Sequence, residues 1–171
     1  MRLAYLIVTG TTTAPRAIDL VGGLVARFSE VLSLMTPHAA RVLAPRDLSS
    51  VPGNRLVESY FDTAILPRPP DGLVLVAPCS FNSLNKLAYG IADNLALSLT
   101  AEAIGRGTPV VVALSLNPPL LRHPRTAGSI ATLCQWGVSV IEPEDTGEGL
   151  RLASTETILA EVDRRNAAAR V

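Results

Sequence analysis

The sequence has only two cysteines, and its basic residues form no cluster. Cysteine occurs only at Cys79 and Cys134, which are far apart and follow no metal-ligand spacing; this argues against a disulfide framework and suits a reducing compartment. The formal net charge at pH 7 is zero and the basic residues are scattered, so no basic stripe is available for nucleic acid. We therefore predict a cytoplasmic protein that binds neither a metal nor a nucleic acid.

Long apolar segments are also missing. No run approaches the roughly 20 uninterrupted apolar residues that a membrane span needs. The opening segment 1–8 is apolar for too short a stretch to be a signal peptide, and it leads into Thr9-Gly10 without a cleavage-like site. These absences predict that the protein has no membrane partner.

Charged residues are scarce. They make up 18% of the 171 residues, against roughly a quarter in an average soluble domain, while 48% of the residues are hydrophobic. This length suits one domain with a single sizeable core. So few charges leave little polar surface for a monomer, and we expect other copies of the chain to cover part of its apolar area.

Short apolar runs alternate with segments of helical periodicity. The runs predict strands at 3–8, 31–35, 73–77, 109–114 and 137–141, and the periodic segments predict helices at 17–28, 84–104, 124–135 and about 154–168. Strands that are apolar throughout and alternate with helices indicate a parallel sheet covered on both faces. We predict one α/β domain over residues 1–171, a doubly wound Rossmann-like or flavodoxin-like sheet in three layers, with a tail helix within about 146–171.

In such sheets ligands bind beyond the carboxyl ends of the strands, so the loops after the strands are the candidate site. After the first strand, Gly10, Thr11 and Thr12 can offer a phosphate several donors at a helix N-terminus, although a threonine-rich helix cap explains them equally well. The second and third glycines of the dinucleotide-binding fingerprint are missing. After the second strand, Thr36 either caps the next helix or reaches the same phosphate. The proline-rich stretch 46–70 is expected to be a long loop bordering the site.

The loop after the third strand carries the most specific pattern. It reads Pro78-Cys79-Ser80-Phe81-Asn82-Ser83 and continues as Asn85-Lys86-Leu87-Ala88-Tyr89-Gly90-Ile91-Ala92-Asp93-Asn94-Leu95. Here the chain resembles the flavin-containing cysteine decarboxylases, whose loop reads Pro-Ala-Ser-Ala-Asn-Thr before a nearly identical continuation. After the fourth strand, Asn117 falls on the asparagine of the family motif Pro-x-Met-Asn-x-x-Met-Trp, with leucines in place of both methionines.

The resemblance implies a site for flavin mononucleotide (FMN), with FAD as the alternative. The residues implied to bind the cofactor are Gly10, Thr11, Thr12, Thr36, Pro78, Cys79, Ser80 and Asn82. Asn117 and Asn82 are the implied catalytic residues, and Asn117 would hold the carboxylate of the substrate. Cys79 is either a redox partner at the flavin edge or a small side chain that fills the place of the family's alanine. Asp93, within the predicted helix, is expected only to cap or to pair locally.

Two departures from the family bear on the reaction. The family's catalytic histidine precedes an isoleucine, and Ala64-Ile65 occupies that place here. His123, which follows the Asn117 loop, is either a substrate-facing group or an exposed loop residue. Phosphopantothenoylcysteine decarboxylases carry a Leu-Ala-Cys-Gly stretch whose cysteine returns a reducing equivalent, but the matching segment 152–155 has Ser154 and no thiol.

The resemblance implies oxidation of a cysteine thiol to a thioaldehyde, which then loses carbon dioxide. Without the tail cysteine, the reaction is expected to stop at an enethiol, as in the peptidyl-cysteine decarboxylases that make an aminovinyl-cysteine precursor. We therefore predict an oxidative decarboxylase acting on a peptide that ends in cysteine, assembled as a homotrimer or homododecamer as in the family. The alternatives are a phosphopantothenoylcysteine decarboxylase of coenzyme A biosynthesis and a flavin-binding partner subunit without catalysis.

Overall fold

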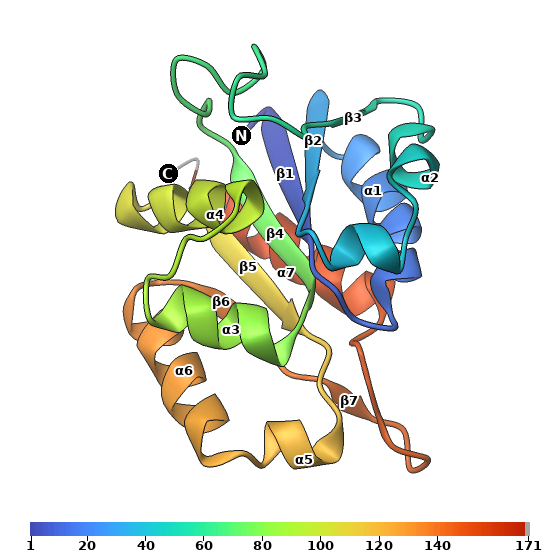
Figure 1. Ribbon diagram of the computed structural model, residues 1–171, viewed down its shortest axis with the longest axis vertical. Coiled ribbons are helices and arrows are strands. Elements are labelled where there is room, and N and C mark those ends of the chain that lie inside the picture. Colours follow the sequence, from blue (N-terminus) through green and yellow to red (C-terminus); the bar gives the residue numbers. More distant parts are fainter. Residues whose placement is uncertain (170–171) are drawn as a thin grey trace.

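Six parallel strands form the central sheet of the protein. The structure, a computed structural model, describes residues 1–169. The strands are β1 (Leu3–Val8), β2 (Glu30–Met35), β3 (Asn54–Leu56), β4 (Leu73–Cys79), β5 (Val110–Leu114) and β6 (Ser139–Ile141). Their order across the sheet is β3-β2-β1-β4-β5-β6, and each neighbouring pair is parallel (Figure 1). This order confirms the predicted doubly wound α/β fold.

Seven α-helices accompany the sheet in the described part of the chain. They are α1 (Ala17–Val25), α2 (Pro45–Ser49), α3 (Phe81–Ala88), α4 (Leu95–Gly105), α5 (Pro118–Leu121), α6 (Pro124–Gln135) and α7 (Thr155–Ala168), with short 3₁₀ helices η1 (Ala14–Arg16) and η2 (Ala39–Arg41). None of the described helices is long and apolar enough to cross a membrane.

The single helix predicted over 84–104 is wrong, because this segment forms both α3 and α4. Gly90 adopts a φ of 69°, a left-handed conformation that ends a helix and suits glycine. Asn94 then starts α4, and its side chain accepts the backbone N–H of Leu97 at 3.2 Å. Asp93 therefore lies in the connection between the two helices and not within a helix.

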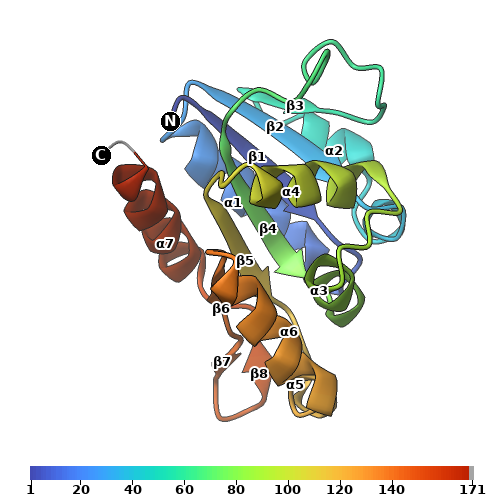
Figure 2. The same cartoon turned by 90° about the vertical axis from the view of Figure 1, so that its left-hand side faces the viewer.

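The strands β1, β2, β4 and β5 each contribute to two cores, because successive side chains point to opposite faces of a sheet. In β1, Ile7 belongs to one core and Leu6 to the other, and both are fully buried. Leu84 of α3 packs in the first core and Ile158 of α7 in the second. In Figure 1, α3 and α4 lie in front of the sheet and α7 passes behind it, and Figure 2 shows the same layers from the side. The sheet is thus covered on both faces, as the apolar strands predicted.

Two irregular segments contain structure that the sequence did not predict. The proline-rich stretch includes β3 and most of α2, and its part 57–70 lies at the end of the sheet away from α5 (Figure 1). Near the C-terminus, β7 (Glu144–Asp145) and β8 (Leu150–Arg151) form an antiparallel hairpin, so the tail helix begins only at Thr155. Of the predicted tail segment, residues 170–171 lie outside the described residues.

Thr9 ties the loop after β1 to the loop after β4. It is fully buried, and its Oγ1 donates a hydrogen bond to the Pro78 carbonyl at 2.8 Å and accepts one from the Ser80 N–H at 2.8 Å. The Thr9 N–H also donates to the Pro78 carbonyl at 3.3 Å. These bonds hold the two loops together where the strand order reverses, which is where doubly wound sheets bind ligands.

Replacing Thr9 with valine should therefore destabilise the protein although the two side chains have nearly the same shape. The Ser80 N–H would lose its acceptor, so we expect the free energy of unfolding to fall by about 1–3 kcal/mol. The matched control is Thr100→Val, since Thr100 is equally buried but donates only to the Ala96 carbonyl of its own helix. Urea unfolding of both variants measures the difference, and equal losses would contradict the assigned role of Thr9.

Candidate functional site

A cavity of about 800 Å³ opens at the carboxyl ends of β1, β2, β4 and β5. It adjoins the point between β1 and β4 at which the strand order reverses. Its wall brings together seven residues singled out from the sequence: Gly10, Thr11, Thr12, Thr36, Ser80, Asn82 and Asn117. Pro78 and Cys79 do not belong to that wall.

The loop after β1 presents hydrogen-bond donors to the cavity. The Thr13 hydroxyl lies 2.9 Å from the Thr11 hydroxyl and 2.7 Å from that of Ser115, so a chain of hydroxyls links this loop to the loop after β5. Among the described residues, the backbone N–H groups of Gly10, Thr12 and Thr13 have no hydrogen-bond acceptor. Unpaired N–H groups beside hydroxyls form a donor set that suits a phosphate group.

Gly10 allows the loops after β1 and β2 to approach each other closely. A Cβ atom on Gly10 would lie 2.5 Å from the Cβ of His38 and 2.9 Å from its carbonyl carbon, so a larger residue would push the loops apart. Thr36 is buried beside them, and its Oγ1 accepts the Ala39 N–H at 3.3 Å. That hydrogen bond agrees with the capping interpretation of Thr36, which also lines the cavity.

The N-terminus of α3 faces the cavity through Ser80 and Asn82. Ser80 caps the helix, because its Oγ accepts the Ser83 N–H at 3.2 Å. The side chain of Asn82 is exposed and has no hydrogen-bond partner within the described residues. Its amide is therefore available to a ligand, whereas the Ser80 hydroxyl is already used within the helix.

Asn117 also caps a helix and yet keeps a free donor. Its Oδ1 accepts the Leu120 N–H at 3.0 Å at the start of α5. The Nδ2 group has no partner in the described part of the chain and borders the cavity. An amide N–H₂ group fixed in this way can donate to a carboxylate oxygen, which is the role that the sequence predicts for Asn117.

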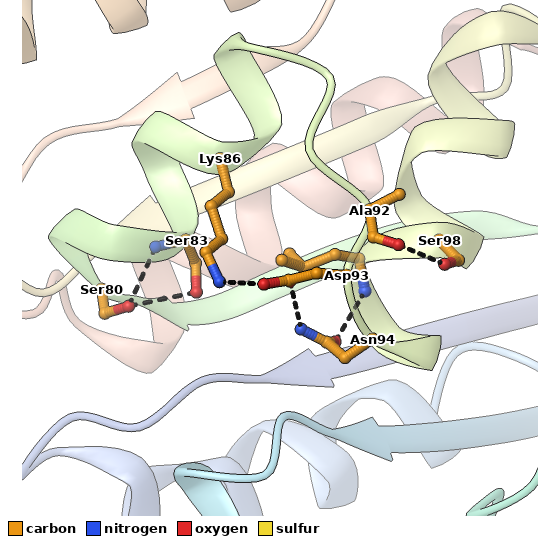
Figure 3. Close-up of polar contacts among 8 residues, drawn as sticks. Ser80, Ser83, Lys86, Ala92, Asp93, Asn94 and Ser98 are labelled. Atoms are coloured by element: carbon orange, nitrogen blue, oxygen red, sulfur yellow. Dashed lines mark hydrogen bonds and ion pairs between the residues drawn. The ribbon is translucent and has the colours of Figure 1, made fainter.

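Lys86 and Asp93 form an ion pair on the cavity wall between α3 and α4 (Figure 3). The hydrogen bond from the Lys86 ammonium holds the pKa of the Asp93 carboxyl below its usual range. Asn94 Nδ2 donates to the other carboxylate oxygen at 3.1 Å. The local pairing expected for Asp93 is thus confirmed, and its partner is the only lysine of the chain.

Several residues of the cavity wall escaped the sequence prediction. Thr13 and Ser115 stand in loops already selected, but their hydroxyl contact joins positions far apart in the chain. Phe81 belongs to the recognised loop and lines the cavity. Arg151 enters the wall from β8, a strand too short to leave a hydrophobic pattern. The loops of the cavity wall could thus be recognised in the sequence, whereas the contacts between the loops could not.

Cys79 lies in the core and not on the cavity wall. Its side chain has no exposed surface, and its Sγ donates only to the Ser80 carbonyl at 3.7 Å. Burial raises the pKa of this thiol to about 12. The structure thus places the Cys79 thiol away from a ligand in the cavity and favours the space-filling interpretation over a redox role.

Neither Ala64, which stands at the family's histidine position, nor His123 lines the cavity. Ala64 packs against the core, and none of the residues 46–70 lines the wall. This stretch therefore does not line the cavity within a single chain, and its expected place beside the peptide substrate stays a prediction. His123 is exposed at the start of α6, where its Nδ1 accepts the Arg125 N–H at 3.1 Å and its ring contacts Phe81.

The family model described as Flavoprotein matches residues 2–167. The chain therefore belongs to the Flavoprotein family, in agreement with the resemblance found in its loops and with the expected flavin cofactor. A probable phosphopantothenoylcysteine decarboxylase of Streptococcus mutans is 30% identical over 175 residues, which cover 94% of this chain and 96% of that protein. The chain spans only 41% and 36% of the bifunctional coenzyme A biosynthesis proteins CoaBC of Thermococcus kodakarensis and Bacillus subtilis.

Solved structures share the fold at low sequence identity. The peptidyl-cysteine decarboxylase EpiD superimposes with a TM-score of 0.76 and 23% identity, covering 94% of this chain and 98% of that one. The FMN-binding protein AtHal3 gives a TM-score of 0.79 and 20% identity, covering 95% of both chains. The similar proteins thus include cysteine decarboxylases of both peptide modification and coenzyme A biosynthesis.

The burial of Cys79 predicts that the two cysteines react very differently with an alkylating reagent. At pH 8 a thiol of pKa near 12 is deprotonated in a fraction of only about one in 10⁴, and the thiolate is the reactive form. Cys134 is exposed, so iodoacetamide should add one group to the native protein and a second only after unfolding. Mass spectrometry counts the adducts, with Cys134→Ser as the control that should take none while folded; rapid double labelling would contradict the buried position.

Proposed function

We propose that the cavity binds FMN, with its phosphate at the loop after β1. The unpaired N–H groups of Gly10, Thr12 and Thr13 and the adjacent hydroxyls support this placement. A volume of about 800 Å³ lies within the range of cofactor pockets. The free amide of Asn82 would then meet the polar edge of the flavin ring, and Thr36 would support the phosphate end.

We further propose that the protein oxidatively decarboxylates a peptide that ends in cysteine. A bound flavin supplies a two-electron oxidant for the cysteine thiol. Asn117 would hold the terminal carboxylate through Nδ2 while its Oδ1 caps α5, so the amide cannot rotate freely. The observation that carries this proposal is the convergence of Asn82 and Asn117 on one cavity from two separate loops.

The residue that replaces the family's tail cysteine favours the peptide reaction over coenzyme A biosynthesis. Ser154 stands there, and its Oγ accepts the Thr157 N–H at 3.0 Å as the cap of α7. A hydroxyl cannot return electrons to an enethiol, so the reaction would stop at the oxidised product. The second candidate, phosphopantothenoylcysteine decarboxylation, is supported by the Streptococcus mutans relative, which matches over almost its whole length.

The missing histidine need not prevent deprotonation of the substrate. A cysteine thiol has a reference pKa of about 8.5 and therefore loses its proton more easily than any hydroxyl side chain. Loss of a positioned general base typically costs about 10²–10⁴-fold in rate. We therefore expect a slow enzyme whose rate rises with pH up to the thiol pKa.

We also propose that the protein forms a homotrimer or a homododecamer. Support comes from large apolar side chains left exposed on a single chain. Three examples lie near one another in sequence, namely Tyr60, Phe61 and Leu66, with Phe61 85% exposed. Other copies of the chain would bury this surface.

The proposed reaction is tested by incubating the FMN-loaded protein with short peptides that end in cysteine. We expect a product lighter by one carbon dioxide and two hydrogen atoms, detected by mass spectrometry. Phosphopantothenoylcysteine serves as the parallel substrate and should give at most an oxidised enethiol. A yellow protein that turns over neither substrate would support the silent partner subunit, and a colourless protein that takes up no flavin would overturn the proposed function.

Asn117→Asp separates the two tasks of Asn117. Aspartate keeps an oxygen for the Leu120 N–H, so the cap of α5 and the thermal unfolding temperature should hardly change. It replaces the Nδ2 donor by a negative oxygen that repels a carboxylate, so we expect kcat/KM to fall by about 100-fold or more. Asn117→Ser, which retains a cap without the added charge, should fall less; equal activity of Asn117→Asp and wild type would contradict the carboxylate contact.

A further inference from the structure

Phe81 lines the cavity at a position where the resembling loop has alanine. It is the first residue of α3, and its ring is partly buried against the core that α3, α4 and α6 share with the sheet. It borders the same cavity as Asn82 and Asn117. A ring left partly open to a cavity is available to a ligand, and neither proposed role of the neighbouring residues uses it.

The His123 ring contacts the Phe81 ring. The two ring centroids are 5.1 Å apart with an interplanar angle of 72°, an edge-to-face arrangement that aromatic pairs prefer. The imidazole is oriented in turn, because its Nδ1 accepts the Arg125 N–H at 3.1 Å. The backbone N–H of His123 donates to the Leu120 carbonyl at 3.3 Å, which joins this pair to α5.

Two leucines line the cavity together with Phe81 and Asn117. Leu116 and Leu120 line the same cavity as Phe81, and the Leu120 carbonyl also accepts the Thr126 hydroxyl at 2.6 Å. The N–H of Leu120 is bound by Asn117 Oδ1. Three apolar side chains, those of Phe81, Leu116 and Leu120, therefore line the same cavity as the free amide of Asn117. We name these three side chains the apolar wall.

We propose that the apolar wall selects peptides whose residue before the terminal cysteine is apolar, and that Phe81 is the residue that determines this preference. The inference rests on the proposed function, in which Asn117 holds the terminal carboxylate. Consecutive Cα atoms are about 3.8 Å apart, so the residue before the cysteine must lie next to whatever binds that carboxylate. An apolar side chain there would leave water for the wall, whereas a polar one would lose its hydration without a partner.

The test uses two pentapeptides that differ only in a phenylalanine or an asparagine before the terminal cysteine. The FMN-loaded wild type should prefer the phenylalanine peptide by about tenfold in kcat/KM, mainly through KM, which is the scale of one aromatic side chain in an apolar pocket. Phe81→Ala should reduce this preference to about twofold or less, mainly by raising KM for the phenylalanine peptide. Phe81→Leu should lie between the two.

A second readout does not depend on turnover. Peptides ending in serine cannot be oxidised at sulfur, so calorimetry on the FMN-loaded protein measures their binding alone and should show the same preference and the same loss in Phe81→Ala. Trp136→Ala is the matched control: it removes an exposed aromatic ring at the C-terminal end of α6, outside the cavity wall, and should leave the preference intact. Thermal unfolding confirms that each variant is folded.

Three outcomes would overturn the inference while leaving the proposed function standing. The first is full retention of the preference by Phe81→Ala, and the second is an equal loss of turnover with both peptides. The third is loss of bound FMN from Phe81→Ala without a change in peptide preference, which would make Phe81 a cofactor contact. Absence of turnover together with absence of flavin uptake would instead be a failure of the proposed function. The serine peptides keep the two failures distinct, because their binding is measured separately.

Discussion

The parallel pairing of β1 with β4 is the constraint on which the candidate site depends. Successive strands are added outward from β1 on one side and from β4 on the other, so the loops that leave these two strands diverge to opposite faces of the sheet. Thr9 holds the beginnings of both loops together with hydrogen bonds to Pro78 and Ser80. A loop rich in free N–H groups and a capped helix N-terminus consequently face one cavity.

Much of this arrangement could be predicted from the sequence because it follows from local patterns. The apolar runs located five of the six strands of the sheet, and the small polar residues after them located the walls of the cavity. β3 escaped, since its three residues Asn54, Arg55 and Leu56 show neither a continuous apolar run nor clear alternation. The break between α3 and α4 was missed because a motif of helical spacing continues across Gly90 and Asn94.

Contacts between distant loops could not be predicted, since they depend on the register of the folded sheet. Thr13 and Ser115 are 102 positions apart, and nothing in their own segments distinguishes a hydroxyl that bridges loops from one that caps a helix. The position of Cys79 is a similar case. Whether a residue at a strand end points into the core or into the cavity depends on a single step of the strand's alternation, and here the thiol points into the core.

The placement of the only lysine affects how the protein can be handled. Reagents that attach dyes, biotin or solid supports through amines have two targets in this sequence, the N-terminus and Lys86. The N-terminal ammonium is engaged by Asn166 Oδ1 at 2.5 Å, and the Lys86 ammonium stands on the cavity wall in its pair with Asp93. Amine coupling at Lys86 would therefore place a label on the cavity wall, whereas a maleimide directed to the exposed Cys134 would leave that region free.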